Sequence, residues 1–241
     1  MEIIDKNIPD TKKENLLVLI QILGGIIIPK INNKSIAEVS RKYQTDFIPA
    51  RWIFSIWPIL YCCLFYGFYK QEYEWDRTSE TLFECVTFSN ISWIYFWTKE
   101  NIVLSGLSFI PLCISLYKLF IRNLNNTDLF LQNTLAAYLC WTLIASTLNC
   151  ASVLKYKIKN KKYKKIIGIL LCFTQIFWTV KGNTIDSFND KKNFYTNSNT
   201  YPLVGMIAYL ALKKNSINVN NQLKVYLLCC IINCLNQINR S

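Results

Sequence analysis

Three apolar stretches of the sequence carry aromatic and small polar residues at helical spacing. Their members are Phe54, Trp57 and Tyr61 in the first stretch, Asn90, Trp93 and Trp97 in the second, and Tyr138, Trp141, Ala145 and Asn149 in the third. Residues three, four or seven positions apart fall near one face of a helix. Converging faces of this kind would form a flat-sided aromatic cavity with a few hydrogen-bonding groups, which suits a planar or rigid apolar ligand such as a porphyrin or a sterol.

Nine of these residues are candidate ligand-binding residues. In an apolar interior a buried amide needs partners and an indole N–H needs an acceptor, so mixed aromatic and amide stripes can orient a ligand. The alternative is that each stripe only packs one helix against another. The nine candidates are Phe54, Trp57, Tyr61, Asn90, Trp93, Tyr138, Trp141, Ala145 and Asn149.

The first stripe lies in the stretch around which the chain is organised, Phe47 to Tyr69. From Trp52 onward it contains 18 residues without a charge, close to the ~20 apolar residues that a transmembrane helix needs. Arg51 precedes it as an interfacial anchor. Pro58 lies inside it, and we expect Pro58 to bend the helix because proline cannot donate a backbone hydrogen bond.

The composition excludes several kinds of site. The chain has 52% hydrophobic residues and 17% charged residues, with the apolar residues gathered into blocks, which indicates a polytopic membrane protein. Because the chain has no histidine, it cannot by itself build a Ser-His-Asp triad or a His-ligated zinc or haem site. The ten cysteines lie in apolar blocks without paired CxxC spacing, so we expect neither a disulfide framework nor a metal site. The net charge of +12 is discounted as a sign of nucleic-acid binding, because Lys and Asn are abundant throughout the polar loops.

The apolar blocks predict an all-α membrane bundle. The predicted core blocks are Leu16–Ile28, Phe47–Tyr69, Leu82–Trp97, Ile102–Ile121 and Leu129–Leu154, the fourth interrupted by Pro111. Further C-terminal blocks are Ile166–Val180, Tyr201–Leu212 and Gln222–Leu235. We therefore predict a polar tail over residues 1–14, a membrane core over 15–155, and a C-terminal extension over 156–241 with two or three more membrane helices.

The polar segments predict local structure and orientation. Ser35 followed by Glu38 fits a capping box for a short interfacial helix from Ile36 to Tyr43. The Pro29–Arg51 connector has five Lys or Arg residues and the segment Lys155–Lys165 has seven lysines, so both should share a side of the membrane and face the cytosol. The sequence does not indicate which membrane this is.

The three stripes resemble motifs of one family. Pro49-x-x-Trp52-x-Phe54-x-x-Trp57-x-x-x-Tyr61 is similar to the P-x-W-x-F-x-x-x-W-x-x-L-Y signature of the TspO/MBR family, the tryptophan-rich sensory or translocator proteins. Asn90-x-x-Trp93 resembles the N-x-x-W pattern of its third helix. Ala137-Tyr138-Leu139-x-Trp141-x-x-x-Ala145-x-x-Leu148-Asn149 resembles its fifth-helix pattern. The resemblance covers about residues 15 to 155, and it implies a five-helix bundle with a pocket for porphyrins, sterols and other aromatic ligands.

The function expected from these features is ligand binding in a bilayer. The protein would be a sensor or transporter for a tetrapyrrole or a sterol-like lipid, with no resident cofactor and no enzymatic activity. The alternatives are a porphyrin-degrading membrane enzyme and a multi-pass protein with a structural or interaction role. An ion-coupled carrier is disfavoured because no ionisable residue lies near the middle of a predicted core span. The expected partners are lipid and a small hydrophobic ligand, not nucleic acid, and a homodimer is left open.

Overall fold

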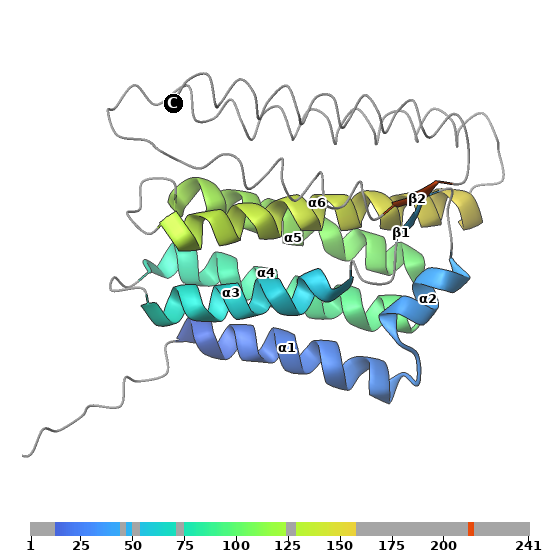
Figure 1. Cartoon of the computed structure of the whole chain (residues 1–241), viewed down its shortest axis with the longest axis horizontal. Coiled ribbons are helices and arrows are strands. Elements are labelled where there is room, and N and C mark those ends of the chain that lie inside the picture. The colour runs from blue at the N-terminus through green and yellow to red at the C-terminus, as the bar shows by residue number, and fades with distance from the viewer. Residues whose placement is uncertain are drawn as a thin grey trace, which may run out of the picture.

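The computed structural model describes residues 13–43, 47–49, 54–70, 75–123, 129–157 and 212–214. Within these ranges the chain forms six helices and two very short strands (Figure 1). The helices are α1 (Lys13–Ile31), α2 (Ile36–Lys42), α3 (Ile56–Lys70), α4 (Arg77–Thr98), α5 (Ile102–Asn123) and α6 (Leu129–Lys157). The predicted Ile166–Val180 and Gln222–Leu235 helices lie outside the described residues, as does nearly all of Tyr201–Leu212.

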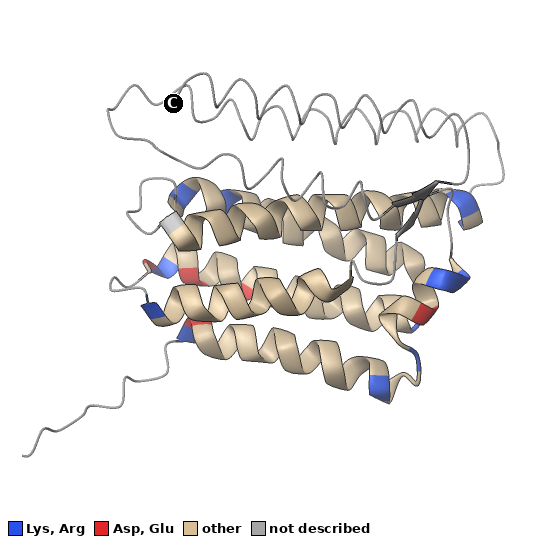
Figure 2. Ribbon diagram, in the orientation of Figure 1, with Lys and Arg blue, Asp and Glu red and all other residues tan. Residues whose placement is uncertain are grey.

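Five of the helices form a closed bundle around one core. α1 packs against α3 and α4, α6 packs against α3 and α5, and α4 packs against α5, which completes the ring. By length and composition α1, α5 and residues Phe130–Lys157 of α6 can each cross a membrane. Charged residues of the described helices lie mostly near the two ends of the bundle (Figure 2). The predicted all-α membrane bundle is therefore confirmed.

The two ends of the bundle are closed by polar contacts between helices. At one end Lys13 at the start of α1 pairs with Glu84 at 2.7 Å and Glu80 at 3.1 Å, both on α4. At the same end the Asp76 side chain caps α4 by accepting from the Ser79 N–H at 3.0 Å, and it pairs with Arg122 of α5. Because these pairs join neighbouring helices, they fix where α1, α4 and α5 begin or end relative to one another.

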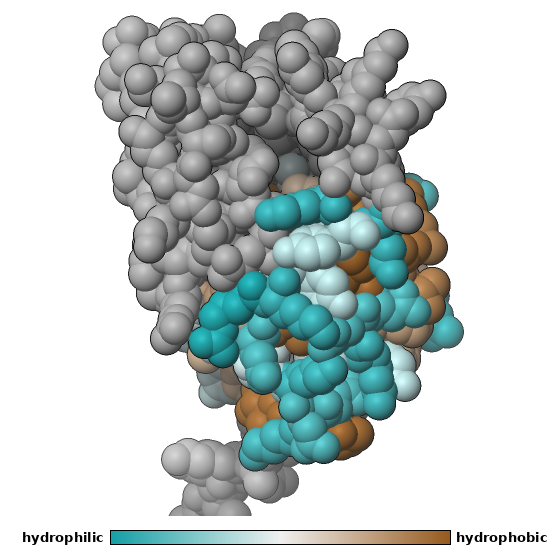
Figure 3. Space-filling model, turned by 90° about the vertical axis from the view of Figure 1, so that its right-hand side faces the viewer, coloured by the Kyte–Doolittle hydropathy of each residue, from teal (hydrophilic) through white to brown (hydrophobic). Residues whose placement is uncertain are grey.

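At the other end the short helix α2 lies across the bundle. Ser35 and Glu38 form the predicted capping box, with the Glu38 N–H donating to Ser35 Oγ at 3.1 Å. Trp97 Nε1 on α4 donates to the Ile36 carbonyl at 3.2 Å. Figure 3 views this end of the molecule and shows hydrophilic side chains gathered over it, with apolar ones at its flanks. The short helix predicted from the capping box is therefore confirmed, and its place at a membrane interface stays a prediction.

α2 also contacts the C-terminal end of α6. Tyr156 Oη donates to the Lys42 carbonyl at 3.1 Å, and Ser152 Oγ donates to the Tyr43 carbonyl at 3.2 Å. The basic connector and the start of the Lys155–Lys165 segment therefore lie at the same end of the bundle, as the charge pattern predicted. That this end faces the cytosol stays a prediction.

A short antiparallel pair joins the α2–α3 connector to a distant part of the chain. Strand β1 (Phe47–Pro49) pairs with β2 (Leu212–Lys214), with Ile48 opposite Lys213. Phe47–Pro49 falls within the predicted apolar block Phe47–Tyr69, for which the sequence predicts no strand. The pair attaches a segment far along the chain to the connector that leads into α3.

The bend predicted at Pro58 is wrong, and Pro111 does not divide the helix that contains it. α3 begins at Ile56, so Pro58 lies in its first turn rather than in its interior. The first N–H groups of a helix have no intrahelical partner, so proline there removes no bond and no bend follows. Pro111 lies within α5, but α5 continues unbroken from Ile102 to Asn123. In a packed bundle, neighbouring helices can support the helix around such a residue.

Glu100 holds α2 against the turn between α4 and α5. Its carboxylate contacts the ammonium groups of Lys34 and Lys42, and it accepts a hydrogen bond from Tyr43 Oη at 3.0 Å. The hydrogen bonds from Lys34 and Lys42 lower the pKa of Glu100 to about 2. Glu100 is therefore an anionic anchor for a cationic segment.

This anchor should give the protein a pH-dependent part of its stability. A carboxylate whose pKa is lowered on folding stabilises fully above its unfolded pKa, and that stabilisation disappears as the pH falls through the folded value. For Glu100 the window runs from its ordinary value of 4.5 down to about 2. As the pH is lowered through this window, the melting temperature of the detergent-solubilised protein should therefore fall less in Glu100→Gln than in the parent. Equal shifts would show that Asp76, whose pKa Ser79 also lowers, accounts for the acid sensitivity.

Candidate ligand-binding site

The aromatic residues predicted to share a cavity are brought together by α3, α4 and α6. The ring of Trp57 on α3 lies 5.3 Å from Trp93 of α4 and 6.1 Å from Trp141 of α6, between ring centroids. It also lies 5.9 Å from both Tyr61 and Tyr138. All five rings are buried. Trp57 is therefore the centre of one aromatic cluster, defined as Trp57, Tyr61, Trp93, Tyr138 and Trp141.

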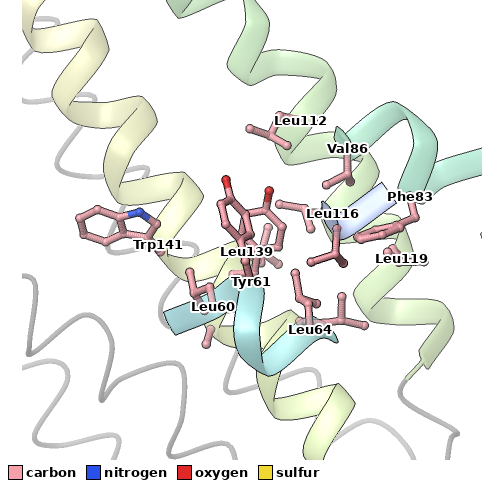
Figure 4. Close-up of a cluster of buried hydrophobic side chains, with 14 of the residues drawn as sticks. Leu60, Tyr61, Leu64, Phe83, Val86, Leu112, Leu116, Leu119, Leu139 and Trp141 are labelled. Carbon is pink, nitrogen blue, oxygen red and sulfur yellow. The ribbon is translucent and has the colours of Figure 1, made fainter. Parts of the chain in front are cut away.

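This cluster forms because each helix presents its stripe to the same interior. α3 contributes its first two turns, α4 a segment one turn from its end, and α6 its middle. Several ring pairs meet edge to face, including Trp57 with Tyr138 and Trp57 with Trp141 at interplanar angles of 88° and 77°. Such arrangements are favoured by the ring quadrupoles. In Figure 4 Tyr61 lies centrally among buried side chains from α3, α4, α5 and α6, with Trp141 at the edge of the group.

A polar network lies beside the aromatic cluster. Asn90 Nδ2 of α4 donates to Tyr61 Oη at 2.5 Å and to Gln21 Oε1 of α1 at 3.0 Å. Tyr138 Oη donates to the same Gln21 oxygen at 2.7 Å, and Gln21 Nε2 donates to Thr87 Oγ1 at 3.0 Å. The network joins α1, α3, α4 and α6 in the apolar interior, where unsatisfied polar groups are expensive.

Two buried polar atoms of the site have no partner. Within the described residues, Asn90 Oδ1 and Trp141 Nε1 make no hydrogen bond. One is an acceptor and the other a donor. Buried polar groups are nearly always paired, so two orphan atoms beside one aromatic cluster indicate a place where a ligand or water could supply the missing bonds.

The remaining candidates lie at the margin of the site or away from it. Phe54 and Ala145 are partly buried and pack against the same apolar core. Asn149 is buried elsewhere, between α6 and α5, where its Nδ2 donates to Ser105 Oγ at 2.7 Å. Its Oδ1 would lie only 3.0 Å from a Cβ placed on Gly106, so this is a close crossing of α5 and α6. The structure therefore does not bring Asn149 to the aromatic cluster.

Trp97 shares the α4 stripe but belongs to a separate small core. It packs with Val39 of α2 and Ile102 of α5 at the end of the bundle. Its indole N–H is satisfied by the Ile36 carbonyl. Trp97 therefore holds α2 in place and does not line the aromatic cluster.

Gln21 and Thr87 were not singled out from the sequence. Both are fully buried. The available signal was Gln21 itself, a carboxamide within the otherwise apolar Leu16–Ile28 block. A polar side chain inside a membrane span usually faces protein and has a partner, so this position pointed to a network.

The comparisons with known proteins identify a family. A family model described as TSPO-like protein matches residues 15–238. No match was found among curated proteins or solved structures. The matched range extends well beyond residue 155, so the family pattern includes most of the segment predicted to be an extension, and the proposed division there stays a prediction. The chain therefore belongs to the family of TSPO-like proteins.

Proposed function

We propose that this membrane protein binds a planar or rigid apolar ligand, a tetrapyrrole or a sterol-like lipid, at the aromatic cluster. The ligand would lie between α3, α4 and α6, and the protein would act as a sensor or transporter. Supporting this proposal, three helices contribute rings to one buried cluster, and two unpartnered polar atoms lie beside it. The proposal concerns binding without chemical conversion of the ligand.

Trp141 carries the proposal. Its side chain is only 3% exposed, yet within the described residues its N–H has no acceptor. The Trp97 indole donates its N–H to the Ile36 carbonyl, whereas the buried indoles of Trp141 and Trp75 have no acceptor among the described residues. Of these last two, Trp141 belongs to the aromatic cluster. A ligand carbonyl, carboxylate or hydroxyl at Trp141 would satisfy the N–H while the ring faces supply apolar contact.

Replacing Trp141 by phenylalanine tests this role. Trp141→Phe keeps an aromatic ring but removes the donor, so the affinity for protoporphyrin should fall by about three- to tenfold, the worth of one hydrogen bond. The measurement is a titration of the full chain in detergent, followed by the porphyrin absorbance band. Because the readout belongs to the ligand, loss of one tryptophan does not change it.

Trp97→Phe is the matched control. It also removes a buried indole N–H from the bundle, but outside the aromatic cluster, so affinity should stay at the parent value. If Trp141→Phe binds as tightly as the parent, the indole N–H does not contact the ligand.

A second experiment separates binding from degradation. The spectrum of protein-bound porphyrin should stay constant during prolonged incubation in light, whereas progressive bleaching that requires the protein would favour the degradation alternative.

A further inference from the structure

Gln21 of α1 is the centre of the buried polar network. Its Oε1 accepts hydrogen bonds from Asn90 Nδ2 and Tyr138 Oη, and its Nε2 donates to Thr87 Oγ1. The side chain is fully buried, and it connects α1 to α4 and α6. Three groups on two helices therefore bond directly to one carboxamide.

The network determines how the Asn90 amide is oriented. Both N–H bonds of its Nδ2 are used, one toward Gln21 Oε1 and one toward Tyr61 Oη. Reversing the Asn90 amide alone would place its oxygen against the Gln21 oxygen, with no proton between the two acceptors. The orientation of the Gln21 amide therefore sets that of Asn90. With the Gln21 oxygen turned toward Asn90, as in the structure, the Asn90 nitrogen is directed into the network and its oxygen has no donor among the described residues.

Asn90 lies beside the proposed ligand site. Asn90 is bonded to Tyr61, whose ring packs on Trp57 at 5.9 Å, and it lies one helical turn before Trp93 on α4. Asn90 is fully buried, so an oxygen without a donor there is costly unless something supplies one. A ligand in the aromatic cluster is well placed to do so.

We propose that Gln21 sets the chemical class of the ligand, by holding Asn90 so that its oxygen accepts from an O–H or N–H of the ligand. The inference rests on the proposed function and deepens it. The preferred ligands are rigid apolar ring systems that carry a hydrogen-bond donor. Gln21 is a positioning residue, since it acts through Asn90 and does not touch the ligand.

Two sterols that differ in one polar group test this selectivity. Cholestanol has an O–H donor, and cholestanone has the same ring skeleton with a carbonyl that only accepts. Each competes with the fluorescent sterol dehydroergosterol on the full chain in detergent, and displacement is followed by energy transfer from the tryptophans. The parent should bind the alcohol about three- to tenfold more tightly than the ketone.

Substitution of Gln21 should remove this preference. In Gln21→Met and Gln21→Leu the Asn90 amide loses its fixed orientation, so the ratio of the two affinities should fall toward one. Val18→Ala is the matched control, because Val18 is fully buried one turn earlier on the same helix but has no part in the network. It should leave the ratio unchanged even if stability decreases.

The outcomes separate this inference from the proposed function. A parent that binds both sterols equally, or prefers the ketone, overturns the role of Asn90. A Gln21 variant that keeps the parent's ratio overturns the role of Gln21. A parent that binds protoporphyrin but neither sterol overturns the inference alone, and one that binds none of the three overturns the proposed function as well.

Discussion

Replacing Ala145 by phenylalanine should block protoporphyrin binding and leave the fold intact. Ala145 lies one turn beyond Trp141 on α6, partly buried and packed against the core. A larger side chain there would fill space beside the Trp141 ring that a ligand needs. Overpacking costs only ~1–3 kcal/mol of folding stability, so the variant should remain folded while it loses ligand binding.

The measurement is a porphyrin titration combined with a melting curve for the same preparation. Leu107→Phe serves as the control, since Leu107 on α5 is 52% exposed and the substitution adds bulk on the outer surface of the bundle. Its affinity should match that of the parent. An Ala145→Phe protein that melts like the parent and also binds like it would place the ligand elsewhere.

Removing the indole of Trp57 should destabilise the bundle strongly. Trp57 is 6% exposed, and its ring contacts four other rings from three helices. In a bilayer, helices are held together mainly by packing and hydrogen bonds, so a cavity at this position removes contacts that lipid cannot restore. Trp57→Ala should cost about 3–5 kcal/mol of unfolding free energy.

Phe88→Ala gives the comparison for this prediction. Phe88 on α4 is 64% exposed, so losing its ring removes few contacts within the protein. Unfolding of both variants in mixed detergent, followed by helical circular dichroism, should show a large loss for Trp57→Ala and a small one for Phe88→Ala. Similar losses would show that the aromatic cluster contributes little to the packing of the bundle.

Much of the helical core was predictable from local patterns. The block predicted as Leu129–Leu154 became α6, Leu129–Lys157, because a long apolar run without a break has few other stable forms in lipid. The Ser35–Glu38 capping box predicted the start of α2, because its two side chains accept hydrogen bonds from backbone N–H groups that have no partner within the helix. The helical spacing of the stripes also predicted that Trp57, Trp93 and Trp141 lie together, as their ring contacts show.

The helical spacing of these residues could not predict which neighbouring helix each helix face contacts. Asn149 falls on the same face of α6 as Tyr138, but it lies 11 residues further along, about 16 Å at 1.5 Å per residue. At that height the neighbour is Ser105 of α5, not the aromatic cluster. Similarly, the start of α3 at Ile56 depends on where the connector leaves α2, which no local signal around Pro58 indicates.

The geometry at Glu100 has a consequence for how substitutions at this position are interpreted. Glu100 adopts a φ of 62°, a conformation that favours glycine, while its carboxylate anchors Lys34 and Lys42. Glycine here would relieve backbone strain and remove the anion at once, two changes of opposite sign. A position that tolerates glycine in a mutational scan would therefore look dispensable, although two separate constraints act on it.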